Sequence, residues 1–350
     1  MNTTETARPD DKLFIRRTLI VIALVSLTWL AWQLREVLLM VFGAVVVATL
    51  FQSLAGVFRK LRLPAGVALA LSVLTIVIIV LLAFALFGAQ LVNQAEGIRE
   101  TLPKAWSALQ QRLEGFGLGG QLKQLTSAGQ GSGFAATAGQ FVMSLGGGLA
   151  DALLIIVGGI FLAASPRFYR TGMVKLIPSS RRELTSEALE DSGTALKLWL
   201  RAQLLTMALV GIATGAGLAL VGMESALAFG LLAALLEFIP FIGPILAAVP
   251  AVIIAFAGDP SMGLKVLAVY FVVQQLEGNL LSPLIQQWAV DLPGAVLLFS
   301  LLAMGTLFGP LGIIFAAPVT VVIYVLVKKL YVREALDTDT TIPGEADAAS

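Results

Sequence analysis

Long apolar runs alternate with short polar connections along nearly the whole chain of 350 residues. A helix needs about 20 apolar residues to cross a hydrocarbon core about 30 Å thick. The runs reach this length about eight times, so the pattern predicts an all-α polytopic membrane protein. The predicted transmembrane helices cover residues 18–34, 37–58, 64–92, 134–165, 198–221, 226–257, 264–285 and 294–327.

The connections divide the chain further. Residues 98–116 place apolar side chains three and four positions apart, which predicts an amphipathic helix that packs on its own protein or lies at the interface. A gate or an oligomer contact is the alternative for this helix. The predicted order is a cytoplasmic tail at 1–17, three membrane helices at 18–92, the extracytoplasmic amphipathic helix and a flexible loop at 93–133, the fourth helix at 134–165, a cytoplasmic connecting segment at 166–197, a C-terminal core at 198–331 and a disordered cytoplasmic tail at 332–350.

Lys and Arg residues cluster at alternate ends of the predicted helices. Cytoplasmic connections carry an excess of these residues, so their distribution indicates orientation. In an eight-helix arrangement all the clusters fall on one side, and both termini are then cytoplasmic. The clusters are Arg16 and Arg17, then Arg59, Lys60 and Arg62, then Arg167, Arg170, Lys175, Arg181 and Arg182, and finally Lys328, Lys329 and Arg333.

Composition agrees with this picture and narrows the chemistry. The chain is 58% hydrophobic and 13% charged, whereas a soluble domain is about 25% charged. A net charge of +1 gives no field that would attract nucleic acid. The chain has no Cys and no His, which excludes disulfides and thiolate metal sites, and no cofactor is expected. Coupling to H⁺ or Na⁺ would have to use carboxylates, amides and backbone carbonyls.

Two of the predicted helices are too long for the bilayer. Residues 226–257 would form a straight helix roughly 48 Å long, and residues 294–327 one of similar length. Both contain Pro and Gly, which free backbone carbonyls that have to be buried in protein or line a wet cavity. Paired breaks of this kind are typical of secondary transporters, and two tilted, Pro-kinked helices are the alternative. The interrupting residues are Pro240, Gly243 and Pro244 in the first segment and Gly305, Gly309, Pro310, Gly312 and Pro318 in the second.

Three carboxylates fall inside predicted helices, namely Asp151, Glu237 and Glu277. A carboxylate at the bilayer centre costs at least about 2.5 kcal/mol on insertion scales, so each one is a candidate for a substrate or ion pathway. Glu237 or Glu277 could bind a proton near neutral pH, or Na⁺ together with backbone oxygens. The alternative is a protonated carboxyl with one structural hydrogen bond, and for Asp151 the two interpretations are equally favoured.

Glu277 lies in the unusually polar sequence QQLEGNLLSP. On a helix, Gln274 and Glu277 share one face while Gln275 and Asn279 share another, so the segment must face protein or water. Gly278 allows another backbone to approach closely. These residues therefore join the candidate pathway.

No motif points to an enzyme or to an energy source. The patterns GxxxxGK[ST], HExxH and GxSxG do not occur. An intramembrane protease would need a Ser/His pair, a metal site or paired aspartates, and the predicted helices offer none of these. We therefore expect a protein that is not an enzyme.

Three segments of the C-terminal half are similar to a known family. They are LLEFIPFIGPILAAVPAVIIAF at 235–256, VVQQLEGNLLSPLI at 272–285 and LLAMGTLFGPLGIIFAAPV at 301–319. In this order and spacing they resemble the autoinducer-2 exporter family, also known as the PerM/YdiK-like permeases. The strong match covers about 198–331, and the N-terminal half agrees in layout only.

The resemblance implies a bacterial inner-membrane transport protein that forms a homo-oligomer, with a pentamer expected. Residues 198–331 would then be the transport core. Members of the family are linked to chemically different cargoes, so the resemblance leaves the substrate open. The positions that carry over are Glu237, Pro240, Gly243, Pro244, Gln275, Glu277, Gly278, Asn279, Pro283, Gly309, Gly312 and Pro318.

Three hypotheses for the function follow. The first is a secondary transporter or exporter of a small polar metabolite, with the quorum-sensing signal autoinducer-2 as a candidate, working by alternating access around the broken helices. The second is a Na⁺(Li⁺)/H⁺ antiporter that exchanges ions at Glu237 and Glu277. The third is a membrane scaffold without transport. The expected partners are the substrate or ion, membrane lipid and further copies of the chain, whereas nucleic acid is not expected.

Overall fold

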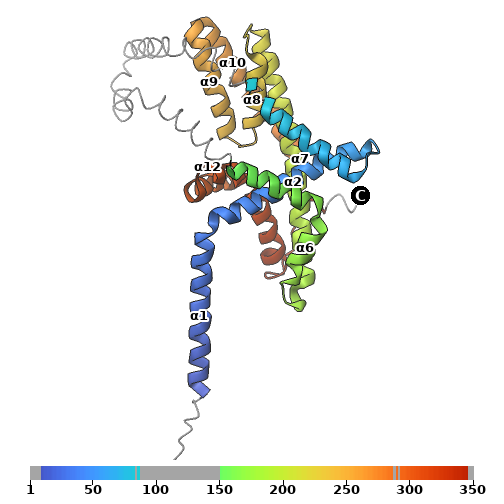
Figure 1. The fold of residues 1–350 in the computed structure, drawn as a ribbon. Helices are drawn as coiled ribbons and strands as arrows, with labels where there is room; N and C mark the ends of the chain where they lie inside the picture. The colour runs from blue at the N-terminus through green and yellow to red at the C-terminus, as the bar shows by residue number, and fades with distance from the viewer. Residues whose placement is uncertain (1–8, 83–84, 87–149, 287–288, 291, 346–350) are drawn as a thin grey trace, which may run out of the picture.

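Every regular element in the described part of the chain is a helix (Figure 1). The computed structural model describes residues 9–82, 85–86, 150–286, 289–290 and 292–345. The two helices Ala150–Ala164 and Pro166–Lys175 are bent relative to each other, and together they make one membrane span in addition to the five long helices named below if they are counted as one. The prediction of an all-α polytopic membrane protein is confirmed. Within the described ranges, five helices are long and apolar enough to cross a membrane: Phe14–Gln33, Arg35–Lys60, Ala65–Leu82, Ser179–Leu220 and Gly294–Arg333.

The first three helices lie close to where the hydrophobic pattern places them. α1 (Pro9–Gln33) and α2 (Arg35–Lys60) are separated by a break at Leu34, and the next helix covers Ala65–Leu82. α1 points away from the rest of the chain in Figure 1, and its large apolar side chains are exposed, as suits a lipid environment. The predicted amphipathic helix and loop at 93–133 lie outside the described residues.

α7 (Arg182–Leu220) is the helix around which the others are arranged. Its 39 residues correspond to about 58 Å, so it extends well beyond a bilayer core of about 30 Å. It joins the predicted cytoplasmic connecting segment to the next predicted span without interruption, after a 3₁₀ turn at Ser179–Arg181. The helices that pack against it include α2, α6 (Pro166–Lys175), α8 (Ala226–Leu236), α10 (Pro260–Leu276) and α12 (Gly294–Leu326).

α7 and α8 approach so closely that their backbones meet at glycines. A Cβ added to Gly230 of α8 would lie 2.7 Å from the Gly215 Cα and 2.9 Å from the Gly211 oxygen of α7. A Cβ added to Gly211 would meet the Ala234 Cβ at 2.5 Å. Because residue numbers rise along α7 as they fall along α8, the two helices run antiparallel. Small residues at four-residue spacing are what allows membrane helices to approach this closely.

α8 and α9 (Ile242–Gly258) fold back on each other. Only residues 237–241 connect them, yet both contribute to one apolar core that includes Ala233 of α8 and Ala247 of α9. Helices joined by so short a loop can share a core along their length only if they are antiparallel. The predicted break into two half-helices at 226–257 is present, but the two arms, about 16 and 25 Å long, form a hairpin instead of one crossing helix.

α10 packs against this hairpin and then changes its winding. The side chain of Asp259 accepts a hydrogen bond from the Ser261 N–H at 3.0 Å, which caps the start of the helix. The Tyr270 hydroxyl donates to the Ala247 oxygen of α9 at 3.2 Å. After α10, a π-helical turn at Glu277–Leu281, η2, leads into the short α11 (Ser282–Gln286).

The predicted count of eight transmembrane helices is not reproduced in the described ranges. Two of the predicted spans, 226–257 and 264–285, are built from shorter helices in the structure. The fourth predicted span in chain order, 134–165, is described only from residue 150 onward. A count of consecutive apolar residues cannot distinguish a helix that crosses the membrane from a segment that turns back within it.

The main apolar core lies where α12 meets α7 and α2. Val321 of α12, Leu200 of α7 and Val46 of α2 are each fully buried and belong to one cluster. Trp199 joins the same cluster and contacts Phe238 edge to face, with ring centroids 6.0 Å apart. This core therefore reaches from the C-terminal helix to the residue that follows Glu237.

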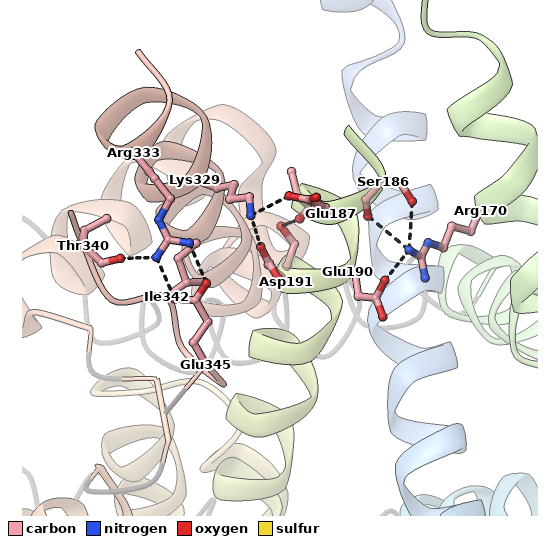
Figure 2. A network of polar contacts seen from close by, with 12 residues as sticks. Arg170, Ser186, Glu187, Glu190, Asp191, Lys329, Arg333, Thr340, Ile342 and Glu345 are labelled. Carbon is pink, nitrogen blue, oxygen red and sulfur yellow. Dashed lines mark hydrogen bonds and ion pairs between the residues drawn. The ribbon is translucent and has the colours of Figure 1, made fainter. Parts of the chain in front are cut away.

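Ion pairs tie the N-terminal half of α7 to its neighbours (Figure 2). Lys329 Nζ lies 3.0 Å from Glu187 Oε2 and 3.3 Å from Asp191 Oδ2, and Arg170 of α6 binds Glu190 at 2.7 Å. Lys329 belongs to η3 (Val327–Arg333), which follows α12, and it is buried. Its two carboxylate partners compensate a charge that would be costly if left alone.

The C-terminal tail folds back against η3 and α7 (Figure 2). The Arg333 guanidinium binds both carboxylate oxygens of Glu345, at 2.7 and 2.8 Å, and Ile342 is buried in the main core. One apolar side chain and a bidentate ion pair thus anchor the part of the predicted tail that the structure describes, as far as residue 345. Residues 346–350 lie outside the described part.

Replacing Gly230 by Ala should destabilise the protein through the α7–α8 contact. The new Cβ would press on backbone atoms of α7, which cannot rotate away, and overpacking of this kind costs about 1–3 kcal/mol. The melting temperature of the purified protein in detergent should fall by several degrees. Gly56→Ala is the matched control, because a Cβ there has no neighbour within 4 Å. Equal melting temperatures for the two variants would contradict the close contact.

The anchoring of the tail should depend on the charge of Glu345. The bidentate bond from Arg333 lowers the pKa of Glu345 from 4.5 to about 2. Because this pKa is lowered in the folded state, the contact stabilises the tail above pH 4.5 and is lost as the pH falls toward 2. Hydrogen exchange of the Ile342 amide, which donates to Glu345, measures this directly.

At neutral pH, Glu345→Gln should increase exchange of that amide at least several-fold, while Glu334→Gln, at an exposed position, should leave it unchanged. Equal protection in both variants would mean that Ile342 alone holds the tail.

Candidate functional site

Glu237 stands at the turn that reverses the chain between α8 and α9. α8 ends at Leu236, so Glu237 follows its last turn, as the sequence predicts. The turn is closed by backbone bonds from Ile239 N–H to the Leu236 oxygen at 2.9 Å and from Gly243 N–H to the Ile239 oxygen at 2.8 Å. These bonds satisfy carbonyls that would otherwise be exposed to lipid.

Local sequence explains the shape of this turn. Pro240 cannot donate the hydrogen bond that would continue a helix. Phe241 then adopts a left-handed conformation with φ of 65°, which reverses the chain direction. A Cβ on Gly243 would overlap with the Leu236 carbonyl, so only glycine fits this position. Pro244 follows inside the first turn of α9, where its missing N–H costs nothing.

The Glu237 side chain is buried, with 3% of the residue exposed. Its carboxyl lies close enough to the carboxyl of Glu277 for the two groups to influence each other electrostatically. The Oε2 atom of Glu237 has no hydrogen-bond partner among the described residues. The structure therefore brings together the two glutamates that the sequence singled out separately, 40 positions apart.

Glu277 lies in the π-helical turn after α10 and has an amide neighbour. Gln274 Nε2 donates to Glu277 Oε2 at 2.6 Å, which fits the predicted common face. Asn279 Nδ2 donates to both the backbone oxygen and the side-chain oxygen of Gln275, at 3.0 and 3.1 Å. Pro283, which cannot donate a hydrogen bond back to Asn279, follows the widened turn. π-turns of this type are frequent at functional sites.

The polar side chains around Glu277 are exposed on the single chain. Gln274, Gln275 and Asn279 all have exposed surfaces, and so does Pro283. A Cβ added to Gly278 would meet nothing within 4 Å, so the predicted close backbone approach there is not made within the described chain. Amide side chains at this depth need polar partners, which another protein surface or water can provide.

The second predicted break occurs in α12. Gly309 has φ of 64° and ψ of −145°, a conformation open almost only to glycine, and Pro310 follows it. A Cβ on Gly312 would overlap with the Met304 carbonyl, and Pro318 is fully buried further along the helix. This break and the α8–α9 turn thus share a design, in which a residue with positive φ precedes a glycine packed on a carbonyl.

The two breaks pack into the same apolar cluster. Phe238, which follows Glu237, belongs to the main core together with Met304, Phe308 and Leu311 around the break in α12. Asp151, in contrast, makes no hydrogen bond or ion pair with any described residue. The contacts of the described residues thus join Glu237, Glu277 and their neighbours, and they do not include Asp151.

Gln203 is a site residue that the sequence interpretation missed. Its Nε2 donates to the Glu237 backbone oxygen at 2.6 Å from α7. The signal was a single amide within an apolar stretch of α7, which is costly in a membrane unless it has a partner. The bond links the turn to the central helix at the level of the carboxyl pair.

The pair of carboxyl groups can hold a proton or a small cation. Two carboxyl groups in contact are able to share one proton, and both can turn toward a cation. In the described ranges no cluster of three or more Asp, Glu, His or Cys residues could hold a metal ion. The groups available for a substrate are the two glutamates, the amides of Gln203 and Gln274, and the carbonyls of the turn.

Comparison with known proteins identifies the family. The family model for AI-2E family transporters matches residues 19–332. YueF of Bacillus subtilis (strain 168), named provisionally as a transport protein, is 35% identical over 46% of this chain and 42% of its own length. YrrI of the same organism, named in the same way, is 35% identical over 43% of each chain, so the match spans less than half of either relative.

A longer match is to TqsA of Escherichia coli (strain K12), named an AI-2 transport protein, which is 24% identical over 91% of this chain and 92% of its own length. The family model covers both the hairpin with Glu237 and the π-turn with Glu277, as well as the N-terminal helices. The chain belongs to the AI-2E family of transporters.

Proposed function

We propose that the protein is a secondary transporter that exports a small polar metabolite, coupled to protons at Glu237 and Glu277. The contact between these two carboxyl groups, at the junction of the α8–α9 turn and the π-turn, is the observation that carries the proposal. Two charged carboxylates in contact repel each other, and a single proton between them removes the repulsion. Binding and release of that proton would change how firmly the turn is held to α10.

The two breaks supply the movable parts. Alternating access needs segments whose backbone bonds are locally complete, so that they can shift without exposing unpaired groups. The hairpin of α8 and α9 meets this requirement through its own turn hydrogen bonds, and the break at Gly309 divides α12 into a second pair of arms. The bond from Gln203 to Glu237 is the polar link between hairpin and α7 that a shift would have to break.

Autoinducer-2 is the substrate that we propose to test first. The long match to TqsA, named an AI-2 transport protein, supports this choice. A small polar metabolite would suit the amides and carboxyls around the turn. We also propose that the protein lies in the bacterial inner membrane with both termini cytoplasmic, and that it works as a homo-oligomer, with five subunits as the first expectation. The exposed amides of Gln274, Gln275 and Asn279 would then meet a neighbouring subunit or the transport path.

Glu237→Gln and Glu277→Gln should each reduce proton-driven flux of autoinducer-2 at least tenfold. Glutamine keeps the size and the hydrogen-bonding capacity of glutamate but cannot bind and release a proton. The measurement uses purified protein in liposomes with an imposed pH gradient. Glu224→Gln is the matched control, because this exposed carboxylate lies between α7 and α8, away from the pair.

The outcomes separate the hypotheses. Full flux in both glutamine variants would show that the site assignment is wrong. Proton movement that depends on Glu277 and is driven by a Na⁺ gradient, without any metabolite, would identify an antiporter instead. An unaltered protein that moves neither metabolite nor ion would support a scaffold.

A further inference from the structure

A cavity lies at one end of the helices, and neither Glu237 nor Glu277 lines it. It has a volume of about 520 Å³ and is formed by α2, the start of the helix Ala65–Leu82, the end of the helix Ala150–Ala164, α6 and α7. Among the described residues, four cationic side chains line it, and no Asp or Glu does. They are Arg59 of α2, Arg167 of α6, and Lys197 and Arg201 of α7.

These four cations have no anionic partner in the described chain. The ion pairs found there use Arg170, Lys329 and Arg333, whereas Arg59, Arg167, Lys197 and Arg201 take part in none. Like charges around one hollow repel each other. An anion bound between them is attracted by each cation, and these attractions offset the repulsion. The cavity therefore has the charge arrangement of a site that binds an anion.

Two helices also begin at this cavity. Ala65 and Gly66 are the first residues of one helix, and Pro166 and Arg167 are the first residues of α6, and all four line the hollow. The first N–H groups of a helix have no partner within the helix and carry a partial positive charge. Ala65, Gly66 and Arg167 carry such N–H groups, which suit phosphate oxygens, whereas Pro166 has none.

The position of α6 places the cavity at the membrane surface. The chain bends by 89° between the apolar helix Ala150–Ala164 and α6. A helix perpendicular to a membrane-spanning one lies in the plane of the interface, and α6 exposes Phe168 there beside its cations. The hollow at this bend is thus at the depth of lipid headgroups.

We propose that the cavity binds the phosphate ester of an anionic phospholipid headgroup. Arg59, Arg167, Lys197 and Arg201 hold the phosphate oxygens, and the apolar surface of the neighbouring helices contacts the acyl chains. Basic pockets between membrane helices at the cytoplasmic surface are suited to such headgroups. A soluble phosphate ester offers the same chemistry, so the test includes both sources.

The first arm of the test measures lipid preference. Purified full-length protein in an uncharged detergent is titrated with phosphatidylglycerol or phosphatidylcholine, and bound lipid is counted by native mass spectrometry. We expect at least tenfold tighter binding of phosphatidylglycerol. The double variant Arg59→Gln/Arg201→Gln should lose this preference, while Arg59→Lys/Arg201→Lys, which keeps both charges, should retain most of it.

A matched control separates the cavity from general surface charge. Lys60→Gln removes the same charge from the next residue of α2, which does not line the cavity, and should keep the lipid preference. Melting curves show whether each variant is folded. A folded double glutamine variant with unchanged preference, or an equal loss in Lys60→Gln, would overturn the proposal.

The second arm tests soluble ligands in the same detergent without lipid. Glycerol 3-phosphate and inorganic phosphate are titrated into the unaltered protein and into Arg59→Gln/Arg201→Gln. Binding that is lost in the variant, together with no lipid preference, would support the phosphate site but assign it to a soluble ester. No binding of any phosphate-bearing probe would overturn the site itself.

Discussion

The contact between α7 and α8 at their glycines is the constraint on which the candidate site depends. Gly211 and Gly215 let α8 lie directly on the backbone of α7, and Gly230 completes the contact from the other side. In a membrane, van der Waals packing of this kind is a main source of helix association, because lipid removes the hydrophobic driving force. With α8 fixed in this register, its last turn ends beside Gln203. The position of the Glu237 backbone, which accepts a hydrogen bond from Gln203, is thereby fixed.

The bilayer sets the second requirement, since every backbone polar group within it must find a partner. A chain that reverses inside the membrane meets this requirement only with short turns that bond to themselves. The turn after α8 and the break in α12 do so in related ways, with Phe241 and Gly309 at positive φ. Gly243 and Gly312 then pack against carbonyls at distances that exclude any side chain. The turn after α8 is thus an ordered structure with its own backbone hydrogen bonds, to which Gln203 of α7 adds one more.

Much of this could be predicted from the sequence, and the exceptions have physical reasons. The all-α class, the breaks and both glutamates follow from hydropathy, Pro and Gly positions and the cost of buried charge. The hairpin did not follow, because an apolar run broken by Pro240 and Pro244 is consistent with a kinked span or a reversal. The small residues Ala247, Ala251 and Ala255, which let α9 pack closely against its neighbours, were the available signal.

The polar tail was predicted to be disordered because its composition is that of a solvated segment, and composition does not show that Ile342 is buried in a distant core. Contacts between residues far apart in the chain, such as Gln203 with Glu237, are in general the part that a single sequence does not contain.

α7 connects the two polar regions of the molecule. Lys197 and Arg201 line the cationic cavity, and Gln203 reaches the Glu237 turn. The distance from Lys197 to Gln203 is about 9 Å along a rigid helix.

An anion in the cavity would hold this part of α7 from one side, and the protonation state of the carboxyl pair would act on it from the other. Because the glycine contact holds α8 about two to three turns further along α7, a movement of the hairpin relative to α7 would first strain the Gln203–Glu237 bond. Coupling between the two regions therefore requires no long pathway, only a change in the position of one short segment of one helix.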